Sequence, residues 1–158
     1  MSEYVISHED EVAIMPENLS FEEAAGIPLA GLTAFQSLID IVKLSSGENI
    51  LIHAGSGGVG TIAVQLAKHL GANVTTTTST GNVTMLKEIG ANNVIDYTKT
   101  NYLELGEKFD VVFDTLGGSH TLDSFKVLKQ GGRLVSIAGD LDEITSKQLG
   151  LNSFVRFI

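Results

Sequence analysis

Short continuous apolar runs along the chain alternate with segments in which apolar residues recur every three or four positions. The continuous or β-branched runs predict buried strands over residues 50–52, 74–78, 94–95, 109–113 and 134–137. Between these runs, helical spacing predicts helices over residues 59–70, 82–89, 101–106 and 122–128. Alternating strands and helices of these lengths predict an α/β fold, with a doubly wound parallel sheet covered by helices on both faces.

The first 45 residues follow a less regular pattern. Residues 4–6 predict a short strand, and Ser20 with Glu23 forms a capping box that predicts the start of a helix. Pro28 is expected to end that helix. A second helix follows, with an apolar face made of Leu32, Phe35, Leu38, Ile39 and Val42.

Both ends of the chain look cut. The strand over residues 4–6 has no obvious partner, and a six-stranded dinucleotide fold needs one more strand than the sequence offers. Residues 149–158 are rich in apolar side chains and stop without a cap. We therefore expect residues 1–18 to be a remnant and lead-in from a preceding domain. Residues 19–158 are expected to form a dinucleotide-binding domain that is incomplete at its C-terminus.

A glycine-rich turn follows the first central strand. Gly55, Gly57 and Gly60 match the pattern G-x-G-x-x-G, directly after an apolar strand and at the start of an amphipathic helix. The first glycine permits a tight turn, the second lets the backbone approach a pyrophosphate, and the third allows close helix packing. Unpaired amides of Gly58 and Val59 at the helix N-terminus complete the predicted phosphate site of a Rossmann-type domain.

The predicted ribose site lacks a carboxylate. NAD-selective domains place an Asp or Glu about 20 residues after the glycine turn, at the end of the second strand. Residues 77–82 of this chain contain hydroxyls and an amide but no acid. Because a carboxylate would repel a 2′-phosphate, this segment favours NADP(H) over NAD(H).

Composition narrows the function and the location. The formal net charge of −9 argues against nucleic-acid and anionic-membrane binding, which need a basic surface. The chain has no cysteine, no apolar run long enough to cross a bilayer and no basic-then-apolar leader. We therefore expect a cytoplasmic protein. Its histidines show no ligand spacing, so no metal, and no zinc in particular, is expected.

The motifs together resemble the medium-chain dehydrogenase/reductase superfamily, in its zinc-independent quinone oxidoreductase-like branch. The resemblance covers residues 4–139 and is carried, in the family's order, by residues 28–35, 51–60, 90–97 and 114–118. It implies the cofactor domain of a two-domain reductase whose other domain is GroES-like. It further implies hydride transfer from NADPH to a quinone, enone or enal, and a homodimer. This chain alone is expected to be inactive as an enzyme.

The resemblance also assigns cofactor-binding positions beyond the glycine turn. Ser79 and Asn82 match 2′-phosphate contacts, and Tyr97 matches a tyrosine near them. Gly81 departs from the pattern, because close relatives often carry Arg or Lys there. The full predicted cofactor site comprises Thr33, Gly55, Gly57, Gly58, Val59, Gly60, Ser79, Asn82, Tyr97, Leu116, Gly117, Ser136 and Gly139.

Other interpretations stay open at this point. His53 and Asp114 lie at strand ends, yet a packed core histidine and a turn-capping carboxylate are the expected roles, and no catalytic residue is assigned. Thr33, Tyr97, Ser136 and Gly139 each also suit a purely structural role. Alternative functions are the cofactor domain of a zinc-dependent alcohol dehydrogenase, a nucleotide-sensing module without chemistry, and a fold kept for interaction.

Overall fold

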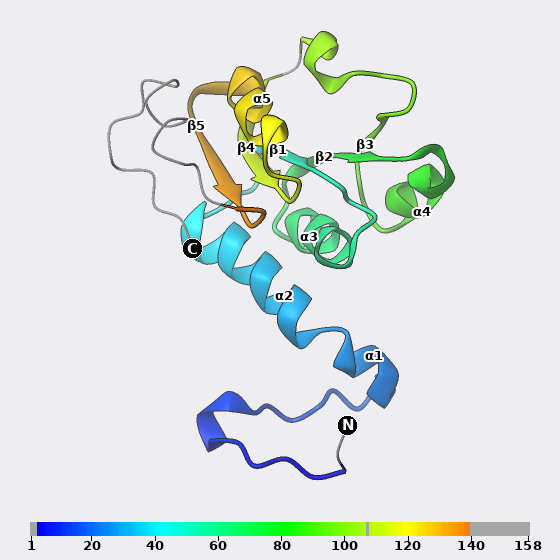
Figure 1. Ribbon diagram of the computed structural model, residues 1–158, viewed down its shortest axis with the longest axis vertical. Coiled ribbons are helices and arrows are strands. Elements are labelled where there is room, and N and C mark those ends of the chain that lie inside the picture. Colours follow the sequence, from blue (N-terminus) through cyan, green and yellow to red (C-terminus); the bar gives the residue numbers. More distant parts are fainter. Residues whose placement is uncertain (1–2, 107, 140–158) are drawn as a thin grey trace.

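The computed structural model describes residues 3–106 and 108–139 of the chain. The centre of the molecule is a five-stranded parallel sheet (Figure 1). The strands are β1 Asn49–Ile52, β2 Asn73–Thr78, β3 Asn93–Asp96, β4 Phe109–Asp114 and β5 Leu128–Ser136. Their order across the sheet is β3-β2-β1-β4-β5, and every pairing is parallel. This order is that of the first five strands of a Rossmann sheet. The predicted α/β Rossmann-type fold is therefore confirmed.

Helices cover both faces of the sheet, as the alternating pattern predicts. The α-helices are α1 Phe21–Ala25, α2 Pro28–Phe35, α3 Gly58–His69, α4 Val83–Glu88 and α5 Ser119–Val127. A π-helical segment, Gln36–Ile41, continues α2, and 3₁₀ helices span Glu9–Glu11, Thr80–Asn82 and Tyr102–Leu105. Helices α2, α3 and α4 pack on one face, whereas α5 and the 3₁₀ helix Tyr102–Leu105 pack on the other (Figure 1).

Alternation along the strands divides the core into two layers. In β1, Ile50 and Ile52 point into the layer beneath α2 and α3, and Leu51 points into the layer beneath α5. All three side chains are completely buried. Each contributes roughly 1.5–3 kcal/mol by burial of its apolar surface. The continuous apolar run at 50–52 thus reflects a strand that is covered on both faces.

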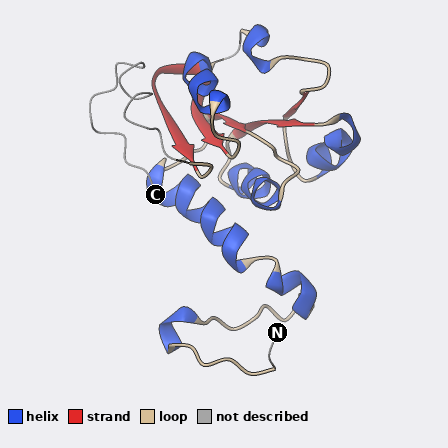
Figure 2. Cartoon of the chain, viewed as in Figure 1, coloured by secondary structure: helices blue, strands red, loops and turns tan. Residues whose placement is uncertain are grey.

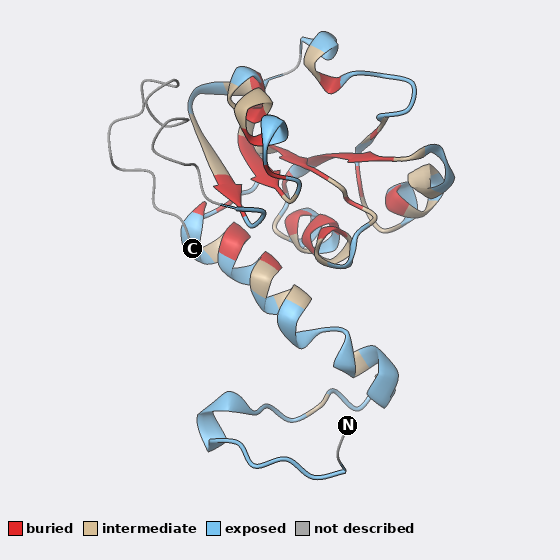
Figure 3. Cartoon of the chain, viewed as in Figure 1, coloured by how far each residue is buried: buried red, intermediate tan, exposed pale blue. Residues whose placement is uncertain are grey.

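The N-terminal arm, residues 3–27, extends away from the sheet (Figure 2) and is almost entirely exposed (Figure 3). The predicted strand at residues 4–6 is wrong, since Tyr4, Val5 and Ile6 are 85–99% exposed and form no strand. A strand needs a neighbour to bond its amides and carbonyls, and the described residues offer none here. The predicted boundary at residue 18 stays a prediction. The apolar segment 149–158 lies outside the described residues.

The second predicted helix forms, but its buried face differs from the prediction. Leu32 and Phe35 are 59% and 47% exposed, whereas Ala34, Leu38 and Val42 are buried. The helix passes into the π-helical segment at Gln36, which changes the angular spacing of side chains and rotates the buried stripe. The first half of α2 also extends past the sheet edge (Figure 3), so its apolar residues have no sheet to cover.

The last helix and strand meet earlier than their pattern predicts. Helix α5 ends at Val127, and Leu128 already belongs to β5. Gly131, at φ 78°, and Gly132 lie inside β5, opposite a register irregularity between Phe109 and Val111 of β4. The sequence pattern therefore predicts only the second half of β5. Glycines inside a strand interrupt the apolar pattern and often accompany a β-bulge.

Candidate functional site: a cleft at the carboxyl edge

The glycine turn begins where β1 ends and is held against β2. The amide of Gly55 donates to the carbonyl of Thr77 at 3.0 Å, and the amide of Ala54 donates to Thr77 Oγ1 at 3.0 Å. The left-handed residue in this turn is Ala54, at φ 49°, rather than one of the glycines. The turn therefore directs the chain from β1 into α3 with its backbone fixed on the neighbouring strand.

Two of the glycines are required by close approach. A Cβ on Gly60 would lie 2.4 Å from the carbonyl oxygen of Ala54, and one on Gly55 would lie 2.0 Å from Thr76 Oγ1. A Cβ on Gly57 would lie 3.3 Å from the Ala54 oxygen, and one on Gly58 would meet nothing within 4 Å. Gly55 and Gly60 thus allow the turn to pack, whereas Gly57 and Gly58 keep its outer surface bare.

The bare side of the turn carries the N-terminus of α3. Gly57 is the N-cap and has no side chain to satisfy the first-turn amides. Amides at the start of a helix have no partner within the helix, and the helix dipole adds a partial positive charge there. The amides of Gly58 and Val59 are therefore placed to bind an anion through the backbone alone.

A cleft of about 750 Å³ runs beside this turn, across the carboxyl ends of β1, β2, β3 and β4. Ligands bind at this edge in open α/β sheets. Its walls come from the turn, from the end of β2, from the segment after β3 and from the start of α5. The lining residues include Ala54, Ser56, Thr77, Thr78, Ser79, Tyr97, Thr98, Lys99, Tyr102, Leu116 and His120.

Outside the glycine turn, the predicted cofactor residues fall into three groups. Ser79, Tyr97 and Leu116 line the cleft beside the glycine turn. Gly117 and Ser136 lie deeper, at the ends of β4 and β5, around Asp114. Like Gly117 and Ser136, the remaining three are not among the residues that line the cleft. Asn82 donates to Ser79 Oγ, Thr33 donates to the Leu29 carbonyl of its own helix, and Gly139 is exposed beyond β5.

Asp114 organises the turn after β4. Its buried carboxylate accepts hydrogen bonds from the amides of Leu116 and Gly117 at 2.9 and 3.1 Å, from Ser136 Oγ at 3.1 Å and from Thr121 Oγ1. Burial alone would raise the pKa of Asp114, but the bonds from Thr121 and the turn amides outweigh it and hold the pKa below its usual range. Asp114 caps this turn and shapes one wall of the cleft.

His53 is a buried packing residue behind the turn. Its Nε2 lies 3.1 Å from Ser124 Oγ, which donates to the carbonyl of His120, and its ring meets Tyr102 edge to face at 5.0 Å. Burial lowers the pKa of His53 to about 4. A neutral imidazole at this position fills the space between β1 and α5.

Comparison with known proteins decides the family. A family model described as zinc-binding dehydrogenase matches residues 58–156, which is more than half of the chain. The chain belongs to the zinc-binding dehydrogenase family. The predicted resemblance to the medium-chain dehydrogenase/reductase superfamily and its quinone oxidoreductase-like branch is confirmed, and the chain is a cofactor-binding domain of this oxidoreductase family.

The similar proteins include one named as a reductase and two named as oxidoreductases. The chain is 45% identical over 141 residues to 2-methylene-furan-3-one reductase of Solanum lycopersicum, covering 88% of this chain and 36% of the relative. It is 40% identical to the chloroplastic NADPH-dependent alkenal/one oxidoreductase of Arabidopsis thaliana, with the same coverage. The quinone oxidoreductase structure from Coxiella burnetii matches with a TM-score of 0.74 at 40% identity, covering 85% of this chain and 41% of that one. The chain thus spans well under half the length of these relatives.

Although the family is named for zinc binding, the described residues contain no group of side chains that could bind zinc. Within residues 3–106 and 108–139, no three His, Asp or Glu side chains form a group that could hold a metal ion. A structural or catalytic zinc needs three or four such ligands at about 2 Å. The described side chains therefore do not fit zinc, and its absence from the whole protein stays a prediction. In the same ranges, no helix is both long and apolar enough to cross a membrane.

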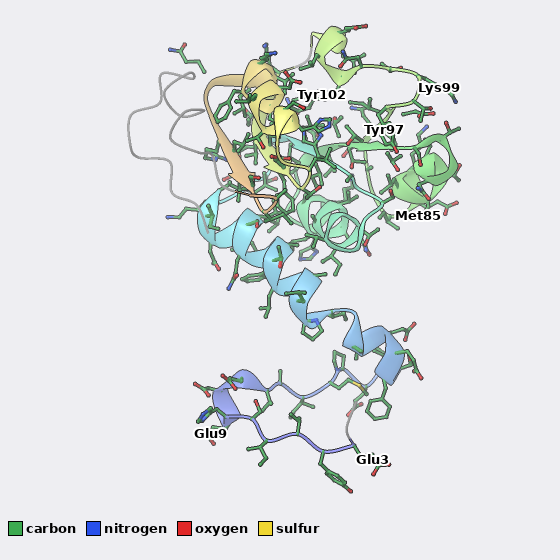
Figure 4. All side chains as sticks on the ribbon, in the orientation of Figure 1. Glu3, Glu9, Met85, Tyr97, Lys99 and Tyr102 are labelled. Carbon is green, nitrogen blue, oxygen red and sulfur yellow. The ribbon has the colours of Figure 1, made fainter. Side chains whose placement is uncertain are left out.

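Sequence reasoning missed the charged residues after β3. Asp96 pairs in register with Thr78, so parallel pairing brings a carboxylate beside the predicted ribose segment, where the sequence of residues 77–82 shows none. Lys99, from the following loop, lines the cleft described above, and Figure 4 labels its position beyond Tyr97. The signal that could have found them was an acid at the end of a strand that neighbours β2, since the carboxyl ends of parallel strands share one edge.

Proposed function

We propose that the chain is the NADPH-binding domain of a reductase that transfers hydride from NADPH to a quinone or another α,β-unsaturated carbonyl. The observation that carries the proposal is the bare glycine turn at the N-terminus of α3, which opens on a cleft lined by hydroxyls. The names of the relatives, an alkenal/one oxidoreductase described as NADPH-dependent among them, support the same donor and acceptor class.

In this proposal the chain binds and orients the cofactor. The amides of Gly58 and Val59 hold the pyrophosphate, and Ser79, Asn82 and Tyr97 surround the adenosine ribose and its 2′-phosphate. Leu116 and Gly117 lie along the cleft, while Thr33, Ser136 and Gly139 belong toward the nicotinamide end. NADPH supplies the hydride when bound. Donors for the developing oxyanion belong to the additional sequence that the longer relatives contain, so no catalytic acid is assigned here.

Titration of the 158-residue chain with NADPH and NADH, followed by nicotinamide fluorescence, tests the site. We expect saturable binding with NADPH preferred, and a loss of roughly 100-fold in affinity for Gly57→Val, because a branched side chain blocks the approach of the pyrophosphate to the backbone. The matched control is Gly26→Val, which should bind NADPH as wild type does. Gly26 has φ −76° and lies on the N-terminal arm, where a Cβ would lie 3.5 Å from the Glu23 carbonyl oxygen.

Turnover separates this proposal from its alternatives. The isolated chain is expected to bind NADPH without appreciable quinone reduction, whereas the whole protein should oxidise NADPH with an enone or quinone. Saturable binding without oxidation on any acceptor in the whole protein would favour a nucleotide-sensing module. Zinc-dependent activity of the whole protein would favour an alcohol dehydrogenase. A homodimer, a cytoplasmic location and the absence of nucleic-acid or membrane partners belong to the same proposal.

A further inference from the structure

A carboxylate with a full set of partners lies next to the cleft, one residue before Tyr97 in the cleft wall. Asp96, the last residue of β3, accepts hydrogen bonds from Thr80 Oγ1 at 2.6 Å and Thr98 Oγ1 at 2.7 Å. Lys99 Nζ lies 3.1 Å from the same carboxylate. Both of its oxygens are thus engaged, so Asp96 is not free to accept the ribose hydroxyls in the manner of an NAD-selective acid.

Lys99 is the movable member of this group. Its side chain is 65% exposed, whereas that of Asp96 is 13% exposed. An ion pair between a fixed carboxylate and a hydrated lysine is screened by water and holds the lysine weakly. Lys99 also lines the cleft together with Ser79 and Tyr97, two of the residues that the proposed function places at the 2′-phosphate. Figure 4 shows Lys99 and Tyr97 on the same segment after β3.

Among the described residues that line the cleft, Lys99 is the one lysine or arginine. Gly81 supplies no charge, and a Cβ on it would meet nothing within 4 Å. His53 in the cleft wall is neutral, because burial lowers its pKa to about 4. A 2′-phosphate brings nearly two negative charges to a cleft wall in which Lys99 already faces Asp96. The charge balance in this wall therefore depends on Lys99.

We propose that Lys99 determines NADPH selectivity by leaving its weak pair with Asp96 and binding the adenosine 2′-phosphate. The inference rests on the proposed function, since it presupposes that the cleft holds the cofactor. Lysine suits the task as a compact point charge with three donors. The hydroxyl of Ser79, which lines the same cleft, adds a neutral donor.

The test compares Lys99→Gln with wild type, Lys99→Arg and Lys87→Gln in titrations with NADPH and NADH. Lys87 is an exposed lysine on α4 outside the cleft lining and serves as the matched control. We expect Lys99→Gln to weaken NADPH binding roughly tenfold, the scale of one charge-assisted hydrogen bond, with the Kd for NADH unchanged within about twofold. Lys99→Arg should retain the preference. Adenosine 2′,5′-bisphosphate should lose affinity in parallel with NADPH, and ADP should not.

The outcomes separate the two proposals. A wild-type chain that prefers NADPH, with the preference intact in Lys99→Gln, overturns the role of Lys99 and leaves the proposed function standing. Equal losses for NADPH and NADH in Lys99→Gln also overturn it, because a selectivity residue acts on the 2′-phosphate alone. A wild-type chain without NADPH preference overturns both this role and the proposed NADPH donor.

Discussion

The two edges of the sheet hold their polar groups in different ways. At the amino edge, charged side chains pair with each other. Arg133 binds both oxygens of Glu48 at 2.6 and 2.8 Å, and Lys129 binds Asp110 at 2.8 Å. Asp110 also accepts the amide of Asn49, at the start of β1, at 2.8 Å. Each of these charged side chains is therefore neutralised by a partner in the same chain, and the contacts link the N-terminal ends of β1, β4 and β5.

At the carboxyl edge the polar side chains that hold the glycine turn are neutral, and the ion pair of Asp96 with Lys99 lies apart from the turn, after β3. The turn is held by hydroxyls, with Thr78 Oγ1 donating to Ser56 Oγ at 2.9 Å and Thr77 Oγ1 accepting from Ala54. The first-turn amides of α3 have no capping side chain over them. The first-turn amides of α3 are therefore free of side-chain partners among the described residues, in contrast to the charged groups of the amino edge.

The difference shows why net charge is a poor guide to an anion site in this fold. Four cations that the structure describes, Lys108, Lys126, Lys129 and Arg133, lie near the ends of β4, α5 and β5, away from the cleft. The predicted phosphate site uses backbone amides and the dipole of α3, which act within the first helical turn and do not depend on the net charge of the surface. An acidic protein can therefore bind a dinucleotide.

The largest expected effect comes from Gly60 at the carboxyl edge. In Gly60→Ala, the new Cβ would lie 2.4 Å from the Ala54 carbonyl oxygen and 2.8 Å from the Gly55 Cα. Both contacts are with backbone, so no side-chain rotation relieves them. We expect a loss of about 3 kcal/mol in the free energy of unfolding, measured by urea denaturation, together with loss of NADPH binding.

Gly58→Ala is the matched control two residues earlier in the same helix. Its Cβ would meet nothing within 4 Å, and alanine in a helix is favoured over glycine by about 0.5–1 kcal/mol. The control is therefore expected to be as stable as wild type or slightly more so. Equal stability of Gly60→Ala and Gly58→Ala would contradict the close packing of the turn.

The second largest effect is expected in the pH dependence of stability, from His53 behind the carboxyl edge. Burial lowers its pKa to about 4, against about 6.5 in an unfolded chain, so the unfolded state binds more protons between these values. Stability is then complete above pH 6.5 and falls as the pH drops toward 4. The linkage relation gives a loss of about 2 kcal/mol at pH 5 relative to pH 7 from this residue alone.

Urea unfolding of wild type and His53→Gln at pH 7 and pH 5 measures this contribution. The carboxylates Glu48 and Asp114 have lowered pKa values and also cost stability in acid, but they do so equally in both proteins. The difference between the two pH-dependent losses therefore isolates His53. Identical losses in wild type and His53→Gln would show that the histidine is solvated in the folded protein.

The sequence predicts the sheet because its central strands are covered on both faces and are therefore rich in apolar or β-branched residues. The prediction fails at residues 4–6, whose side chains favour a strand, because no described strand lies beside them. It also misjudges Leu32 and Phe35, because a local π-helical segment changes the spacing on which a helical face is predicted. Local sequence determines neither the partner of a strand nor an irregularity in a helix.

The candidate site likewise has one part that the local sequence predicts and one part that it does not. The glycine turn is a local motif, and the structure places it where its sequence predicts. Asp96 lies 16 residues beyond Thr80, with Lys99 further on, and only the pairing of β2 with β3 brings them to the ribose segment. Scanning residues 77–82 for an acid cannot find them. A search along the ends of neighbouring strands does so.

The smallest effect is expected at the amino edge, from Arg133→Gln. The variant removes the two bonds to Glu48, but Glu48 keeps the amide of Ser45 at 2.8 Å, and the Arg133 side chain is 40% exposed. A pair this accessible to water contributes about 0.5–1 kcal/mol, so urea unfolding should show a loss of that size. The Kd for NADPH should not change, because the pair lies at the opposite edge from the cleft. A tenfold weaker Kd in Arg133→Gln would show that the two edges are coupled, and that the charges of the amino edge contribute to the cleft across the sheet.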